Sequence, residues 1–322
     1  MIKIAYFGSP KFSADFLEKI LKDKEIKKII SVEFIITQPD KRAGRKQILT
    51  PTPVKQIALK NNLKIFEIEK FDLKNSLKIK NLKLKIAELD IVLVYAYSSI
   101  IPKEFLDLPK YGFWCLHPSL LPKYRGPSPI VYTLLNGDEK TGVTIFKMDE
   151  KIDHGPIIAQ ENLTIKNNDY RIDLETKLTD LGFELFKKTI EKLFNSPNLL
   201  TFKPQNHNIA TYTQILRKND GYIKYESLKK VLNNEKIKNE DLPKIIKNLK
   251  LKIENSSKKI YDFFRAMSPW PGVWTILPNN KRLKIIDIFF DNNKQQLLIT
   301  KVQLEGKKPV DFKTFKKAYN FF

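Results

Sequence analysis

The residues best suited to chemistry are a histidine and an aspartate in two separate turns. His117 follows a short apolar run, Phe113 to Leu116, and Pro118 and Pro122 come directly after it. Each proline lacks the backbone donor that a helix or a strand ladder needs, so regular structure stops here. We therefore place His117 on a stiffened loop at the end of a buried strand, where open α/β sheets hold their ligands. Asp153 lies further along, in an acidic turn.

Together the two residues could move a proton. A histidine side chain exchanges protons near neutral pH, and a neighbouring carboxylate fixes its tautomer and favours the protonated ring. Taken alone, His117 could be a structural histidine in a proline-rich loop, and Asp153 could simply cap a turn. Cys115 points to the same side of its strand as His117, because side chains alternate along a strand. Its thiol is a weak hydrogen-bond donor, and both a buried small hydrophobe and a nucleophile activated by His117 remain open.

Longer motifs around these residues carry a resemblance to a known family. The segments HPSLLPKYRG (117–126) and TGVTIFKMDEKIDHGPI (141–157) resemble the catalytic signature of the formyltetrahydrofolate-dependent formyltransferases. The segments TQPDKRAGR (37–45), ATYTQILRKNDGYIKY (210–225), SPWPGVWT (268–275) and VQLEGKKP (302–309) resemble landmarks of the methionyl-tRNA formyltransferases within that family. The last three have no counterpart in the single-domain relatives that formylate a purine precursor.

The resemblance implies a reaction and a set of roles. The formyl group of 10-formyltetrahydrofolate, a co-substrate, would pass to the α-amine of initiator methionyl-tRNA, with no metal. This acyl transfer needs a proton-handling group and donors aimed at the developing oxyanion. The resemblance assigns proton handling to His117 and its support to Asp153. It places Cys115 where the family carries an asparagine that donates to the formyl oxygen. The residues expected to contact the folate are Ser119, Leu120, Leu121, Pro122 and Tyr97.

The cysteine leaves alternatives open. Losing one good oxyanion donor typically costs about 10² to 10³ in rate. The chain could be a slower enzyme, it could recruit a backbone N–H instead, or it could be a catalytically weakened homologue that binds tRNA or folate. A further alternative is a related formyltransferase acting on a small amine, such as an amino sugar nucleotide.

A basic stretch follows the second predicted strand. Lys41, Arg42, Arg45 and Lys46 surround a glycine, and we interpret them as a mobile loop able to lie along phosphates. A charge run is often only a solvated loop, but its place near the predicted catalytic turn favours contact with tRNA. The resemblance points to Arg42 as the residue that reaches the acceptor end. The whole chain carries 58 Lys and Arg against 36 Asp and Glu, a net charge of +22 that suits a nucleic-acid partner or reflects a Lys- and Asn-rich bias.

The hydrophobic pattern predicts an α/β fold. Strands at 2–7, 32–37 and 91–95 alternate with helices near 11–22 and 53–61, which is typical of a parallel sheet flanked by helices. The run 91–95 is apolar throughout, as in a strand buried on both faces. Short helices are expected near 103–108 and 130–135, and an amphipathic helix over 173–194. We thus expect a Rossmann-like catalytic domain at 1–194 and a polar linker at 195–208.

The remainder, 209–322, is expected to be a smaller C-terminal domain that binds tRNA. Strands at 285–290 and 296–302, joined by a tight turn at Asp291, suggest an OB-like β-barrel. The Lys/Asn-rich segment 232–257 reads as an insertion. Trp270 and Trp274 could stack on bases, but we favour a place in the core.

Composition limits the cellular setting. The 322 residues are enough for two domains with separate cores, and their 42% hydrophobic content is that of a folded protein. One cysteine excludes an intrachain disulfide and suits a reducing cytosol. No secretory leader or long apolar run is apparent. We expect a cytoplasmic monomer without membrane contact.

Overall fold

The computed structural model describes residues 1–44, 46–71, 77–247, 249 and 255–322 and divides into two compact units. The N-terminal unit comprises Met1–Gly126, Lys140–Leu163 and Glu175–Tyr212, and the C-terminal unit comprises Pro127–Glu139, Thr164–Leu174 and Thr213–Phe322. The segment we interpreted as a linker thus lies within the N-terminal unit, where Lys203 pairs with Ile157 through two backbone hydrogen bonds of 2.8 Å.

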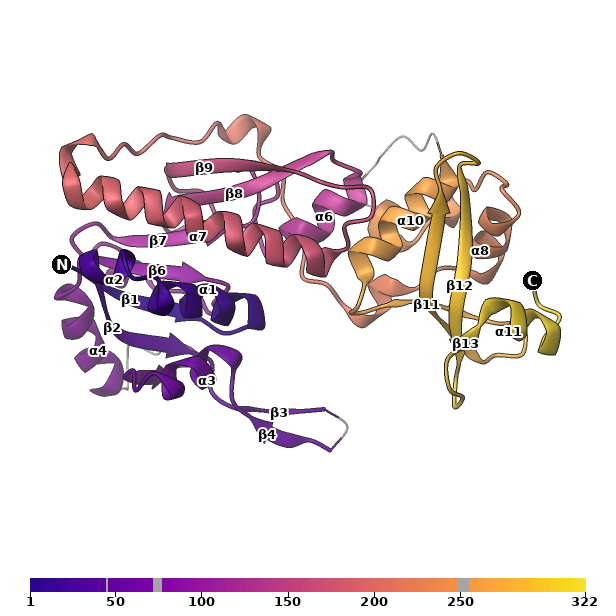
Figure 1. Ribbon diagram of the computed structural model, residues 1–322, viewed down its shortest axis with the longest axis horizontal. Helices are drawn as coiled ribbons and strands as arrows, with labels where there is room; N and C mark the ends of the chain where they lie inside the picture. Colours follow the sequence, from indigo (N-terminus) through magenta and orange to yellow (C-terminus); the bar gives the residue numbers. More distant parts are fainter. Residues whose placement is uncertain (45, 72–76, 248, 250–254) are drawn as a thin grey trace. The chain divides into compact units, whose positions relative to one another are not determined.

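The N-terminal unit is built on a seven-stranded sheet in the order β5-β2-β1-β6-β7-β8-β9 (Figure 1). The pairs from β5 to β7 are parallel, and β8 runs antiparallel to β7. The strands are β1 (Ile2–Gly8), β2 (Ile30–Thr37), β5 (Ile65–Glu67), β6 (Ile91–Tyr95), β7 (Phe113–His117), β8 (Lys140–Lys147) and β9 (Ile157–Thr164). The helices are α1 (Lys11–Lys22), α2 (Ile26–Ile29), α3 (Pro53–Lys60), α4 (Leu77–Ala87), α5 (Lys103–Leu106) and α7 (Arg171–Asn195). This is the α/β sheet flanked by helices that the sequence predicts.

Both faces of the sheet are covered, which explains its continuous apolar strands. On one face, Val92 and Val94 of β6 join a cluster with Ile79 and Leu82 of α4 and Phe105 of α5. On the other face, the ring of Tyr95 lies 5.5 Å from that of Phe16 in α1, and Phe16 in turn contacts Phe186 of α7. Every residue of β6 is buried, as expected for a strand with helices on both sides.

Two features differ from the sequence-based expectation. The stretch interpreted only as Lys-rich and polar contains α4, because Ile79, Leu82 and Ile86 recur at helical spacing and are buried. The basic stretch expected as a loop is a two-stranded ribbon, β3 (Lys41–Ala43) paired antiparallel with β4 (Ile48–Thr50). The β-prone run Ile48 to Thr50 provides the partner strand, and Gly44 turns the chain at φ +69°.

The C-terminal unit contains a four-stranded antiparallel sheet in the order β10-β11-β12-β13. Its strands are β10 (Val273–Ile276), β11 (Arg282–Asp291), β12 (Gln296–Leu304) and β13 (Val310–Asp311). Its helices are α6 (Pro129–Asn136), α8 (Tyr225–Leu232), α9 (Lys244–Lys247), α10 (Ser256–Met267) and α11 (Phe312–Ala318). The predicted tight turn between β11 and β12 is present, and the Asp291 carboxylate accepts hydrogen bonds from the N–H groups of Asn293 and Lys294.

Helix α10 forms the centre of this unit. It packs against α6, where the buried Lys259 donates to the carbonyl of Leu135 at 2.6 Å. Of the predicted insertion, 248 and 250–254 lie outside the described residues. Trp270 is not in the core, because its side chain is 51% exposed, whereas the half-buried Trp274 lies under the guanidinium of Arg282 at 4.2 Å.

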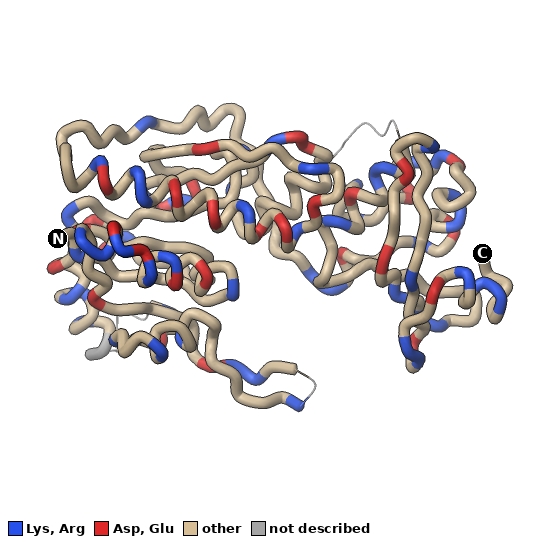
Figure 2. The backbone as a smooth tube through the Cα atoms, in the orientation of Figure 1, with Lys and Arg blue, Asp and Glu red and all other residues tan. Residues whose placement is uncertain are grey.

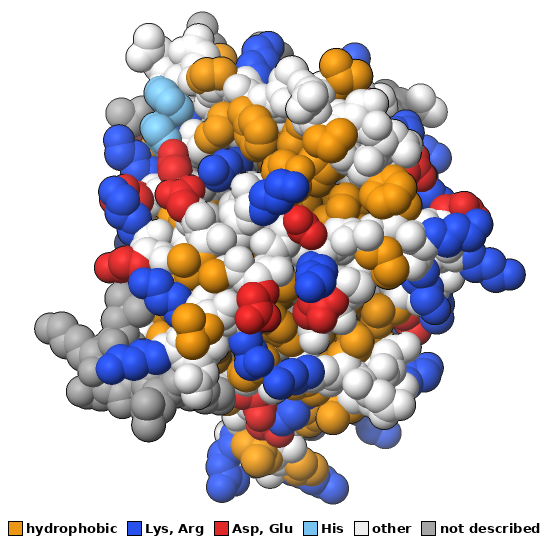
Figure 3. Space-filling view, turned by 90° about the vertical axis from the view of Figure 1, so that its left-hand side faces the viewer, with side chains coloured by type: hydrophobic (Ala, Val, Ile, Leu, Met, Phe, Trp, Pro, Cys, Tyr) orange, Lys and Arg blue, Asp and Glu red, His pale blue; other side chains and the backbone are white. Residues whose placement is uncertain are grey.

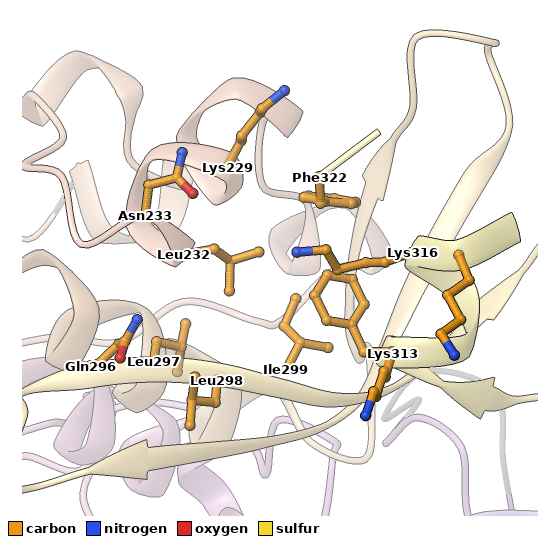
Figure 4. A pocket seen from close by; sticks show the side chains of 12 residues that line it. Lys229, Leu232, Asn233, Gln296, Leu297, Leu298, Ile299, Lys313, Lys316 and Phe322 are labelled. Carbon is orange, nitrogen blue, oxygen red and sulfur yellow. The ribbon is translucent and has the colours of Figure 1, made fainter. Parts of the chain in front are cut away.

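A cleft of about 580 Å³ lies between α8, β12 and α11 (Figure 4). Leu232, Leu297 and Ile299 line it with apolar side chains, and the described residues around it include no acidic one. Its lysines are Lys229, Lys313, Lys316 and Lys317. The cleft is therefore apolar inside and basic around its edge.

Basic residues are distributed along the chain rather than concentrated in one element (Figure 2). On the face shown in Figure 3, Lys and Arg side chains alternate with acidic and hydrophobic ones. None of the helices in the described ranges is long and apolar enough to cross a membrane.

Candidate active site

The turn that follows β8 folds back and brings Asp153 next to His117 at the end of β7. In the antiparallel register of β7 and β8, His117 lies opposite Thr144, and β8 ends beside the start of β7, where the N–H of Met148 donates to the carbonyl of Phe113 at 2.7 Å. Gly155 lets this turn close tightly, since a Cβ atom there would lie 1.8 Å from the carbonyl oxygen of Lys147. The turn folds back toward His117, and the N–H of Gly126 holds the Asp153 carboxylate beside it.

His117 is held between two acceptors. Its Nε2 lies 2.9 Å from the carbonyl oxygen of Tyr124, which can only accept, so Nε2 carries a hydrogen. Its Nδ1 lies 3.6 Å from Oδ2 of Asp153. Nδ1 is therefore the nitrogen left to receive a proton, and the carboxylate stabilises a proton received there.

Asp153 is itself fixed in place. Its Oδ2 accepts a hydrogen bond of 2.6 Å from the backbone N–H of Gly126. Its backbone φ is +47°, in the left-handed region that aspartate tolerates better than most residues. The 3.6 Å separation from Nδ1 exceeds a hydrogen bond, as is common in active sites before substrate binds.

Cys115 lies on the same side of β7 as His117 and is half-buried. It packs at the edge of the apolar cluster that includes Val94 and Phe113. Burial first, and the charge of Asp153 second, raise the pKa of the Cys115 thiol well above its ordinary value. A thiol that stays protonated at neutral pH is a poor nucleophile, so the site disfavours covalent catalysis by Cys115.

The expected folate segment is an ordered loop. Ser119 donates through Oγ to the carbonyl of Lys123 at 2.6 Å, and its own carbonyl accepts from Thr144 Oγ1 at 2.7 Å. The N–H of Leu121 donates to the same Thr144 hydroxyl at 3.1 Å. Leu121 is buried, whereas Leu120 and Pro122 are half-buried. The loop is thus preformed, as ligand sites usually are.

Tyr97 lies at the end of β6 and packs against the apolar cluster. Its hydroxyl donates to the carbonyl of Ile68 at 2.6 Å, and burial raises its pKa above the ordinary value. A neutral, oriented phenol with an apolar ring suits the wall of a site for an aromatic ligand.

A cluster of hydrogen-bonded and stacked side chains lies next to the pair. Arg125 is buried and donates from both Nε and a terminal nitrogen to Oε1 of Gln205. The same terminal nitrogen lies 2.9 Å from Nδ1 of His207. His207 stacks on His154, with ring centres 3.9 Å apart, and His154 is held by Asp149 at 2.6 Å. Arg125, Asp149 and His154 lie within the two motifs at 117–126 and 141–157, whereas Gln205 and His207 lie in the segment interpreted as a linker.

The residues expected to contact tRNA are surface residues. Lys41 and Arg42 lie on the exposed ribbon, and Lys46 lies in its turn. Lys41 pairs with Glu69 at 3.3 Å, but both side chains are 62% exposed, so the pair contributes little. Arg42 donates to the carbonyl of Gln47 at 3.2 Å. Arg45 lies outside the described residues.

A histidine beside a carboxylate, at the carboxyl end of a parallel strand, is an arrangement found in α/β enzymes. The sequence model of the formyl transferase family matches residues 2–190, more than half of the chain, and the model described as "Formyl transferase, C-terminal domain" matches residues 246–297. The chain belongs to the formyltransferase family, and it is a transferase of formyl groups.

Curated relatives extend over most of the chain. The methionyl-tRNA formyltransferase of Caldicellulosiruptor saccharolyticus is 38% identical over 282 residues, covering 88% of this chain and 78% of the relative. That of Thermodesulfovibrio yellowstonii is 33% identical and covers 97% and 94%. These relatives confirm the resemblance read from the motifs.

Solved structures share the fold at lower identity. The 4-N formyltransferase of Francisella tularensis has a TM-score of 0.59 at 23% identity, covering 87% of this chain and 95% of that one. The N-formyltransferase of Helicobacter canadensis, in complex with folinic acid and dTDP-3-aminofucose, has a TM-score of 0.57 at 22% identity, covering 90% and 89%. The formyltransferase fold is thereby confirmed.

The formyl donor of the family is formyltetrahydrofolate. The preformed loop 119–122 and the oriented Tyr97 fit an aromatic ligand of this kind. Among the residues described, no three His, Cys, Asp or Glu side chains gather as a metal site would require.

Proposed function

We propose that this chain transfers the formyl group of 10-formyltetrahydrofolate to the α-amine of initiator methionyl-tRNA, which supplies formylmethionyl-tRNA for translation initiation. The observation that carries this proposal is the identity of 38% and 33% to two methionyl-tRNA formyltransferases along most of their length. Three solved N-formyltransferases whose names or bound ligands refer to sugars are 22%, 16% and 22% identical to the chain.

The distribution of charge supports a tRNA partner. The ribbon β3–β4 projects Lys41, Arg42 and Lys46 into solvent, where a phosphate backbone could neutralise them. The lysine-rimmed cleft of the C-terminal unit offers a second place for phosphates. A small amine substrate would require neither feature.

His117 and Asp153 carry the proton transfer in this proposal. The attacking amine must lose a proton, and Nδ1 of His117 is the nitrogen able to receive it while Nε2–H stays bound to Tyr124. The Asp153 carboxylate, 3.6 Å from Nδ1, stabilises the ring when it gains that proton. Cys115 offers only a weak S–H donor toward the formyl oxygen, so oxyanion stabilisation comes mainly from other groups.

Folate contacts belong to Ser119, Leu120, Leu121, Pro122 and Tyr97 in this scheme. The bonds of Thr144 to the carbonyl of Ser119 and the N–H of Leu121 keep the loop in one conformation. A preformed loop reduces the entropy lost when a ligand binds. We further propose that the chain works as a cytoplasmic monomer.

A formyl transfer to an amino sugar nucleotide is the second candidate, because solved relatives by fold include sugar N-formyltransferases. The experiment measures formylation of charged initiator tRNA and of a dTDP-amino sugar side by side, with the same enzyme and formyl donor. We expect kcat/KM to be at least about 10³-fold higher for the tRNA, a difference of about 4 kcal/mol in transition-state binding. Faster formylation of the sugar would overturn the substrate assignment while leaving the family intact.

A further inference from the structure

We propose that Arg125 and Gln205 are positioning residues that together hold Asp153 in place beside His117. The inference rests on the proposed function, because it takes His117 and Asp153 as the proton-handling pair. It assigns a role to 195–208, which the sequence suggests to be only a polar linker.

Arg125 is the anchor of this arrangement. It is 1% exposed, and its Nε and one terminal nitrogen donate to Oε1 of Gln205 at 3.2 and 2.6 Å. Its other terminal nitrogen donates to the hydroxyl of Tyr212 at 3.2 Å. A guanidinium is costly to bury unless its donors are satisfied, so the position of Gln205 is closely defined by this fork.

Gln205 links the Arg125 side chain to the turn that holds Asp153. Its side chain is buried, and its Nε2 donates to the carbonyl oxygens of Asp153 at 2.9 Å and Gly155 at 2.7 Å. These two carbonyls flank His154, at the point where the backbone of Asp153 adopts a positive φ. One amide group therefore fixes the turn from which the Asp153 carboxylate projects.

The backbone groups on either side of Arg125 also contact His117 and Asp153. The preceding carbonyl, of Tyr124, accepts from His117, and the following N–H, of Gly126, donates to the Asp153 carboxylate. The N–H of Arg125 itself donates to the carbonyl of Thr211 at 2.8 Å. Tyr124 thus contacts His117, and Gly126 contacts Asp153. The Arg125 side chain between them binds Gln205, which binds the turn that holds Asp153.

The stacked histidines complete the support. Nδ1 of His207 accepts from Arg125 at 2.9 Å, which requires a neutral ring. Desolvation first, then the neighbouring His154 and Arg125, lower the pKa of His207, which favours that neutral form. His207 in turn stacks on His154, the residue between the two carbonyls that Gln205 holds.

The test is a double-mutant cycle between Gln205→Met and Asp153→Asn, with kcat and KM measured for formylation of initiator methionyl-tRNA. Gln205→Met removes both the acceptor for Arg125 and the two donated bonds at similar length. We expect kcat to fall about 10- to 50-fold with KM values within about twofold. In the Asp153→Asn background the same change should cost less than about threefold, because Gln205 acts through that carboxylate.

Equal losses in both backgrounds, or an unchanged kcat in folded Gln205→Met, would overturn the proposal. Asn206→Ala is the matched control, since Asn206 is the exposed neighbour whose side chain accepts from the N–H of Asn208. If Gln205→Met fails to fold, Gln205→Glu replaces it in the cycle, because it keeps the acceptor for Arg125 and replaces the two donated bonds by repulsion between a carboxylate oxygen and the two carbonyl oxygens.

An NMR readout separates this inference from the proposed function. Wild-type protein that is folded but inactive on methionyl-tRNA refutes the substrate, not the positioning. The side-chain ¹⁵N resonances of His117 then decide, because they need no substrate. We expect them to shift in Gln205→Met in the same direction as in Asp153→Asn and to stay in place in Asn206→Ala. Unshifted His117 resonances in Gln205→Met would overturn the proposal.

Discussion

Asp153→Asn tests the electrostatic role of the carboxylate most cleanly. The substitution keeps the shape of the side chain, and the amide oxygen can still accept from the N–H of Gly126, which lies 2.6 Å from Oδ2. What it removes is the negative charge 3.6 Å from Nδ1 of His117. The fold should persist while the stabilisation of a proton on Nδ1 is lost.

The distance sets the size of the effect. At an effective dielectric constant of about 20, two unit charges 3.6 Å apart interact by about 4–5 kcal/mol. The side chains of His117 and Asp153 are only 6% and 16% exposed, so solvent screens the pair partly rather than fully. Taking about half of the Coulomb energy, ~2–3 kcal/mol, we expect kcat/KM to fall about 30- to 150-fold.

The assay is steady-state formylation of charged initiator tRNA by wild type and Asp153→Asn, with thermal unfolding of both proteins. The loss should appear in kcat, because the charge acts when the proton moves, and Tm should change by only a few degrees. A folded variant that loses less than about threefold, or loses only in KM, would refute the electrostatic reasoning.

Three further predictions concern other parts of the site. Cys115→Asn should raise kcat at least about 10-fold by adding an amide donor to those that already stabilise the oxyanion, measured by single-turnover formylation; an unchanged rate would mean that a side chain at this position does not reach the formyl oxygen. Burial raises the pKa of the Cys115 thiol, so Cys115 should react with iodoacetamide at pH 7 at least about 10-fold more slowly than free cysteine. Its reactivity should increase only at pH values above the usual thiol range. Labelling is followed by mass spectrometry, and rapid labelling at pH 7 would contradict this prediction. Replacing Lys41 and Arg42 by alanine should lower the slope of log affinity against log salt by about two units in tRNA-binding titrations; an unchanged slope would exclude the ribbon from phosphate contact.

Local sequence patterns were enough to predict several helices and where they end. Helix α1 begins and ends at the predicted residues, Lys11 and Lys22, because its apolar face repeats at helical spacing after a Pro turn. Helix α6 starts at Pro129 and is closed by Gly137 at φ +74°, matching the turn signal in the sequence. Such features depend on neighbours within a few positions, which a single sequence displays.

The features that were missed depend on partners distant in sequence. Strand β4 has an apolar pattern but is exposed, so only its pairing with β3 reveals it. Gln205 and His207 lie in a polar, proline-containing stretch, and their roles arise from contacts with Arg125, about 80 positions earlier. Hydrogen-bond partners at that separation leave no periodic trace in the sequence.

The candidate site was only partly visible for the same reason. His117 and Asp153 could be paired from their motifs, and the hydrogen bond from the N–H of Gly126 to the Asp153 carboxylate shows what holds them together. The acceptor at Nε2, the carbonyl of Tyr124, belongs to the backbone, and any residue type could have supplied it. The sequence alone therefore predicted the pair of His117 and Asp153 but not the backbone carbonyl of Tyr124 that fixes the tautomer of His117.

The most direct test of the central claim is single-turnover formylation of initiator methionyl-tRNA with 10-formyltetrahydrofolate, by wild type beside His117→Ala. We predict that wild type forms formylmethionyl-tRNA within one turnover and that the rate falls at least about 100-fold in His117→Ala. If folded wild type forms no product, or if His117→Ala is as fast as wild type, the assignment of this site to formyl transfer onto tRNA is contradicted.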